Sequence, residues 1–166
     1  ENKRKDVRPL SPERVDIETI REQSKIFSQN EILISFANSL SQMVVVLNPE
    51  RQIIFANQLF LDFLQKKDLL SVLGKRPGEA TECIYSDLVE GGCGHSPFCR
   101  TCGAVNSILE SQIGKRSIQE CNILNNENEA LDLQITSTPY LHNCYEFTIF
   151  ALNDISHEKR RQNLER

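Results

Sequence analysis

The chain has 166 residues, of which 39% are hydrophobic and 25% charged, as is usual for one globular domain with flanking segments. Its formal net charge of −4 gives no reason to expect nucleic acid as a partner, because proteins that bind nucleic acid usually carry a basic face. No apolar run approaches the roughly 18 residues of a membrane span, so we expect no membrane insertion by this part of the chain. The sequence shows no signal-peptide pattern and begins without Met, which favours a piece of a longer cytoplasmic protein whose thiols stay reduced unless a metal holds them.

Residues 1–40 are predicted to be a linker and a dimerisation helix. Ser11, Pro12 and Glu13 have the order of an N-cap, a first helical position and an acidic first turn. Apolar residues then recur at mostly helical spacing as far as Leu40, with a polar interruption at residues 28–30. The apolar stripe is narrow, so we expect one or two helices that pair with a second copy of the chain in a homodimer.

The sequence changes in character at Met43. The run "MVVVLNPERQIIFAN" consists of two β-branched segments around an Asn-Pro-Glu-Arg turn, which predicts a hairpin. Asn57 can cap the next helix, whose apolar residues Leu59, Phe60 and Phe63 share one face.

After a cysteine-rich loop at residues 78–103, a helix is predicted up to Gly114, followed by strands at 117–124, 130–140 and 144–152. The sum is an α+β fold with a five-stranded antiparallel sheet and helices packed on one face. The charged residues 157–166 predict an exposed helix at the end of the chain.

Three stretches in this order resemble the PAS family of sensory domains: "VVVLNPERQIIFANQLFLDFL", "LLSVLGKRPGE" and "FTIFALNDISHEKRR". The resemblance covers about residues 30–156. It implies a PAS domain at residues 41–155 with strand order 2-1-5-4-3, small-molecule or cofactor sensing, and dimerisation through the flanking helices. It also implies that residues 156–166 begin an output helix leading to a C-terminal output domain of the same chain. The parent would be a signalling protein such as a histidine kinase, either cytoplasmic or the cytoplasmic part of a membrane-anchored sensor.

Four of the six cysteines lie in the cysteine-rich loop with the spacing C-x9-C-x5-C-x2-C: Cys83, Cys93, Cys99 and Cys102. Four soft thiolates can bind zinc or an iron–sulfur cluster, and the ligand type alone does not separate these two. Two disulfides, or four inert buried thiols, are the alternative interpretations. The C-x2-C pair ends at Gly103, where a helix N-terminus would lower the thiol pKa.

Other candidates in the sequence have simpler explanations. Cys121 and Cys144 fall in predicted strands, so we expect core residues that are dispensable for any metal. His95 is either a substitute ligand or an exposed loop histidine. Glu79, Glu82 and Asp87 are expected to be solvated loop acids, and His157 is not placed as a phospho-accepting histidine would be.

No catalytic triad, nucleotide-binding loop or paired-carboxylate motif is present in the sequence, so we expect no catalysis by this fragment. Haem and flavin are not expected either, because the cysteine-rich loop replaces the short helices that usually wall a PAS cavity.

Two functions of different classes fit these observations. The first is a sensor of redox state or oxygen, acting through a metal or cluster on the four cysteines. The second is an architectural PAS dimerisation module, whose cysteine-rich loop is held by a structural zinc or by disulfides and senses no ligand.

Overall fold

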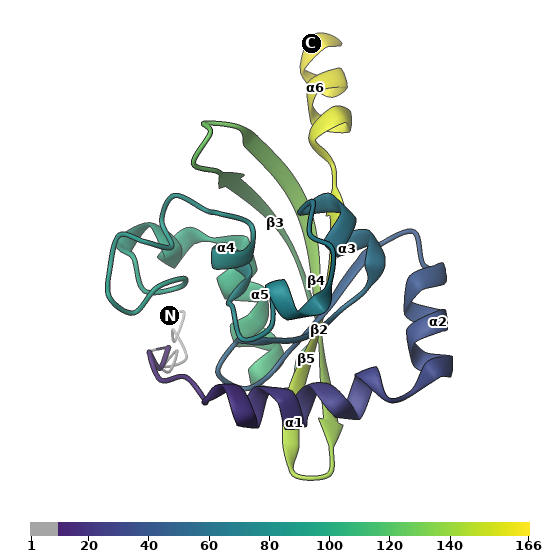
Figure 1. Cartoon of the computed structure of the whole chain (residues 1–166). Coiled ribbons are helices and arrows are strands. Elements are labelled where there is room, and N and C mark those ends of the chain that lie inside the picture. The colour runs from purple at the N-terminus through teal and green to yellow at the C-terminus, as the bar shows by residue number, and fades with distance from the viewer. Residues whose placement is uncertain (1–9) are drawn as a thin grey trace.

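The computed structural model describes residues 10–166. Within this range the chain folds around one five-stranded antiparallel sheet with the strand order β2-β1-β5-β4-β3 (Figure 1). The predicted α+β class and strand order are therefore confirmed. The strands are β1 (Met43–Leu47), β2 (Ile53–Ala56), β3 (Ser117–Leu124), β4 (Ala130–His142) and β5 (Tyr145–Asp154).

Strand β1 lies in the middle of the core, and all five of its residues are buried. Val45 packs on one face of the sheet with Phe60 and Ile108. Val46 points to the other face, where it packs with Ile20 and Phe27. The uninterrupted apolar run of β1 follows from this burial on both faces, because a strand with one face in water would alternate with polar residues.

The helices that cover the first face are α3 (Gln58–Phe63), α4 (Pro77–Ala80) and α5 (Gly103–Gln112), with short 3₁₀ turns η1 (Leu69–Ser71) and η2 (Pro97–Thr101) between them. Asn57 caps α3 as predicted, since its side-chain oxygen accepts the N–H of Phe60. The same buried amide also accepts the N–H of Val44 and donates to the carbonyl of Ala37. One side chain thus joins α3 to β1 and to the preceding helix.

The N-terminal helices are α1 (Ile17–Ser28) and α2 (Glu31–Ser39); α1 crosses the second face of the sheet, and α2 lies to the side of the sheet (Figure 1). The predicted helix start at Ser11, Pro12 and Glu13 is wrong, because α1 begins after Asp16, whose side chain accepts the N–H of Thr19. Residues 11–13 are not helical, since their carbonyl groups accept hydrogen bonds from buried arginines. Residues 1–9 of the predicted linker lie outside the described residues.

The last helix, α6 (Ser156–Leu164), extends away from the sheet (Figure 1). Only Ser156 of this helix is buried, and its hydroxyl accepts the N–H of Asp132 on β4. Lys159 forms an ion pair with Glu120 on β3 at 2.5 Å. Across residues 10–166 there is no helix with the length and apolar character needed to cross a bilayer.

Candidate functional site

A cavity of about 390 Å³ lies between the first face of the sheet and the cysteine-rich loop. Its apolar walls come from the sheet and from α5, including Val45, Phe150 and Ile108. All four predicted site cysteines line the cavity, together with one cysteine that was not predicted to belong to the site: Cys83, Cys93, Cys99, Cys102 and Cys121. The structure therefore gathers the cysteines of the loop and one cysteine of β3 around one space.

The loop backbone is shaped to bring these sulfurs inward. The N–H of Cys83 donates to the carbonyl of Gly78 at 2.8 Å, and Cys83 forms an isolated antiparallel bridge with Asn125. A Cβ atom on Gly78 would lie 2.6 Å from the sulfur of Cys93, so only glycine allows that thiol to pack there. Cys99 is buried in η2, and Cys102 is the residue that precedes the first turn of α5.

The cysteines are all free thiols. Thiolates are suitable ligands for zinc or an iron–sulfur cluster, but the side chains as they stand do not form a metal site. Within residues 10–166 no three His, Cys, Asp or Glu side chains are grouped closely enough to share an ion. Holding a metal or cluster would thus require the thiols to rotate into the cavity that they already line. The tetrathiolate remains a prediction.

The thiols differ in acidity. Burial raises the pKa of Cys83, and burial raises the pKa of Cys93 to about 12. The pKa of Cys102 is lowered, first by a hydrogen bond with the Cys121 thiol and also by the N–H groups of Val105 and Ala104 in α5. Cys121 shows the opposite shift, since donating to Cys102 raises its pKa.

The sulfurs of Cys102 and Cys121 are 3.6 Å apart. Cys121 is buried, as its predicted core position requires, but it also completes the wall of the cavity. Its place opposite Cys102 could not be read from the sequence, because the pairing depends on how α5 lies across β3. The predicted core position of Cys144 is wrong, because this residue is exposed in the turn between β4 and β5, which begins only at Tyr145.

Two buried arginines attach the cysteine-rich loop to the rest of the domain, and sequence reasoning missed both. Arg76 is fully buried, and its guanidinium donates only to backbone carbonyls. Burial, then the positive charges of Arg51 and Arg14, lower its pKa to about 10, so it stays protonated at neutral pH. Its acceptors come from three separate segments: Glu50 in the β1–β2 turn, Gly91 in the loop, and Ser11, Pro12 and Glu13 before α1.

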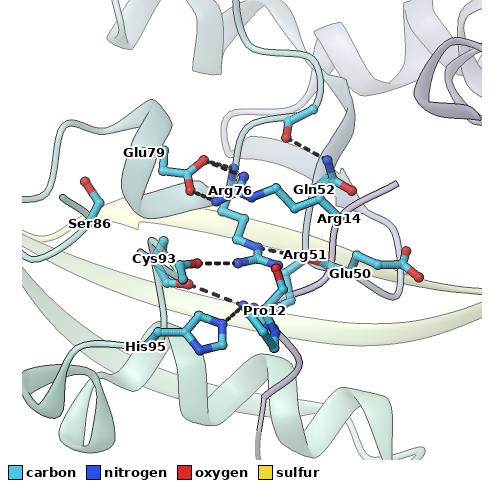
Figure 2. Close-up of polar contacts among 12 residues, drawn as sticks. Pro12, Arg14, Glu50, Arg51, Gln52, Arg76, Glu79, Ser86, Cys93 and His95 are labelled. Atoms are coloured by element: carbon cyan, nitrogen blue, oxygen red, sulfur yellow. Dashed lines mark hydrogen bonds and ion pairs between the residues drawn. The ribbon is translucent and has the colours of Figure 1, made fainter. Parts of the chain in front are cut away.

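Arg51 lies beside Arg76 and faces the cysteine-rich loop (Figure 2). It donates to the carbonyl of Cys93 at 3.3 Å and to the Nε2 atom of His95 at 3.0 Å. Because a guanidinium can only donate, Nε2 must be the unprotonated nitrogen of a neutral imidazole. Burial and the nearby arginines lower the pKa of His95 accordingly. His95 is half-buried and engaged with Arg51, so it is not the exposed loop histidine that was expected.

Glu79 is not a solvated acid either. Its carboxylate pairs with Arg14 and accepts the N–H of Arg76 at 3.0 Å (Figure 2). No sequence signal separates these residues from ordinary surface charges, because Arg14, Arg76 and Glu79 meet only when residues more than 60 positions apart fold together. Glu82 and Asp87 are exposed, as predicted.

No family model matches the chain, and no curated protein matches it. Solved structures do. A PAS domain of an HTR-like protein from Haloarcula marismortui has a TM-score of 0.52 at 16% identity, with 77% of this chain and 98% of that chain covered. A PAS domain from a two-component sensor histidine kinase has a TM-score of 0.52 at 7% identity, with 75% and 94% covered. An RNA-binding light-oxygen-voltage receptor has a TM-score of 0.56 at 19% identity. The match covers 81% of this chain and 35% of that chain. The chain thus has the PAS fold.

Proposed function

We propose that this chain is the sensory module of a signal-transduction protein, and that it responds to redox state or oxygen through a metal or cluster held by Cys83, Cys93, Cys99 and Cys102. The observation that carries the proposal is that all four thiols line one cavity against the core of a PAS fold. The sheet and α5 supply mainly apolar walls to this cavity. The four thiols are therefore the groups on its wall that could bind a soft metal.

The chain's own residues supply three parts of such a site. Gly78 leaves room for the sulfur of Cys93, and Arg51 donates a hydrogen bond to the backbone carbonyl of Cys93. The N-terminus of α5 favours a thiolate at Cys102. An iron–sulfur cluster, when bound, would supply one-electron redox chemistry, whereas zinc would supply a fixed cross-link.

A response in the loop has two physical routes to the ends of the domain. Arg76 joins Gly91 of the loop to the residues just before α1. On the other side Cys102 adjoins β3, where Glu120 pairs with Lys159 of α6. We propose that α6 carries the response to an output domain such as a histidine kinase, the class of protein to which one of the structural neighbours belongs.

Metal content and colour after anaerobic purification test this proposal. A brown protein with iron and sulfide supports a cluster, and each single Cys→Ser change at the four positions should then remove most of the metal, because the four thiolates bind it as one set. Cys144→Ser is the matched control, since that thiol is exposed and distant in the fold. Full metal content in two or more of the four variants would refute the shared site, and a wild-type protein without bound metal would refute the metal altogether.

An architectural module is the second candidate, and the surface of α2 favours it. Ile32 and Phe36 lie one turn apart on α2 and are 83% and 66% exposed. Such a pair is typical of a helix that meets a second copy of the chain. A colourless protein with one zinc per chain, dimeric whether the sample is oxidised or reduced, would support this function over sensing.

A further inference from the structure

We propose that Cys102 and Cys121 form a reversible disulfide when a peroxide oxidises the protein, which makes the pair a modification site separate from any metal. The sulfurs are 3.6 Å apart, which is within contact distance. A disulfide needs a sulfur separation of about 2.0 Å. Only a small approach of two side chains is therefore required.

The backbone segments that carry the two cysteines lie against each other. A Cβ atom on Gly103 would lie 2.0 Å from the carbonyl oxygen of Glu120 and 3.3 Å from the Cβ of Gln119. The residue after Cys102 thus touches the residue before Cys121. Because a disulfide cannot form between cysteines whose backbones stand far apart, this neighbouring contact favours the bond.

The two thiols differ in access, which gives the reaction an order. Cys102 is half-buried and lines the cavity at the first turn of α5. Cys121 is only 5% exposed and reaches the cavity from β3. A small oxidant that enters the cavity therefore meets Cys102 first, and Cys121 is placed to react second.

The chemistry needs a peroxide and no other reactant. The sulfur of Cys102 attacks the O–O bond of hydrogen peroxide, forms an S–O bond, and releases one water, which gives a sulfenic acid. The sulfur of Cys121 then attacks the Cys102 sulfur, the S–O bond breaks, and the hydroxyl group leaves as a second water with the proton of the Cys121 thiol. Two thiols lose two electrons and two protons, and the peroxide is reduced to two waters.

The bond would join the start of α5 to β3 next to Glu120. That residue holds Lys159 of α6, so the modification lies one residue from the contact that attaches the C-terminal helix. The proposal does not depend on a bound metal. If a metal uses Cys102, forming the disulfide removes that ligand.

Peptide mapping of the wild-type chain tests the proposal directly. Cleavage after Lys, Arg and Glu places Cys102 in peptide 101–110 and Cys121 in peptide 121–127, each without a second cysteine, and Cys144 in peptide 130–146. Reduced protein is treated with hydrogen peroxide, both as purified and after removal of metal by a chelator, and the remaining thiols are then alkylated. We expect peptide 101–110 to be linked to 121–127 in one or both samples, and the link to disappear with dithiothreitol.

The variants assign the link to these two cysteines. Cys102→Ser and Cys121→Ala should each abolish the link, while Cys144→Ser should leave it unchanged. Because the wild-type mapping does not depend on any variant folding, the test stands even if Cys121→Ala is unstable. Absence of the link in both wild-type samples, or a link from Cys102 to any other cysteine, would overturn the proposal. A wild-type protein that binds no metal but still forms the link would refute the proposed metal function and leave this inference intact.

Discussion

The Nη1 atom of Arg76 lies 2.8 Å from the carbonyl oxygen of Gly91, so a fully buried cation holds the cysteine-rich loop to the body of the domain. The same guanidinium reaches Glu13 at 2.9 Å, on the segment that leads into α1. Backbone carbonyls surround the charge in place of a carboxylate. The loop and the N-terminal segment consequently share one support.

Replacing Arg76 with Met should destabilise the protein by about 3–5 kcal/mol, because several buried carbonyl groups lose their donor at once. Urea unfolding measures the loss, and limited proteolysis should show the cysteine-rich loop cut first. Arg100→Met is the matched control, since Arg100 lies in the same loop but is exposed. An equal effect of the two substitutions would show that Arg76 is not the support.

Replacing Glu79 with Gln should cost about 1 kcal/mol at neutral pH, because the pair with Arg14 is partly exposed. Burial alone would raise the pKa of Glu79, but hydrogen bonds from Arg14 and from the Arg76 N–H outweigh it and lower the pKa below the ordinary 4.5. The stabilisation is therefore complete above pH 4.5 and is lost as the pH falls through the lower folded value.

The difference in unfolding free energy between wild type and Glu79→Gln should accordingly close as the pH is lowered from 6 to below about 4. Glu82→Gln makes the same chemical change at an exposed position three residues further on and should show no such closing. A difference that stays constant over this pH range would contradict the assigned pairing.

Replacing Gly103 with Ala should destabilise the protein by about 2–4 kcal/mol, because the new methyl group meets the Glu120 backbone and α5 must move away from β3. Gly114→Ala is the control: its φ of +87° is strained for alanine, but nothing lies within 4 Å of the added carbon, so a cost of about 1 kcal/mol is expected there. Thermal unfolding of both variants distinguishes steric overlap from backbone strain.

Replacing Ile32 and Phe36 together with Ser should convert the expected homodimer into a monomer, as measured by sedimentation at tens of micromolar. The sheet should keep its stability within about 0.5 kcal/mol, since both side chains are largely exposed. Leu70→Ser, at a residue 72% exposed on another surface, should leave the dimer intact. A monomeric wild-type protein would refute the predicted dimer.

The sequence alone suggests a different test of the dimer, which is a deletion at the N-terminus. The narrow apolar stripe of residues 12–40 predicted that a partner must cover it, and removing residues 1–30 would then loosen the dimer. In the structure, Ile20 and Phe27 of α1 pack on the protein's own sheet. Deleting α1 would expose core, whereas α2 carries the apolar side chains that remain uncovered.

The fold could be predicted because its signals are local. Apolar β-branched runs and turn residues mark the hairpin of β1 and β2, and Asn57 marks the start of α3. The site was predicted only as far as its sulfur atoms: the spacing of four cysteines indicated a shared role, but it contained no information on Cys121. Arg51 and Arg76 were missed for the same physical reason, since a buried arginine is recognised by the distant carbonyl groups that surround it and not by its neighbours in the chain.

The attachment of α6 has a consequence for how far this helix can turn. Its first turn is held by the Ser156 hydroxyl and by the Lys159–Glu120 pair, whose side chains are 38% and 58% exposed, and no apolar side chain of the helix is buried. An exposed ion pair contributes about 0.2–1 kcal/mol and weakens as salt rises. Since a change of about 1.4 kcal/mol alters an equilibrium tenfold, one new contact is enough to redistribute α6 among its orientations. The domain core can then stay as it is while ionic strength, or one bond at β3, selects the direction in which the helix leaves.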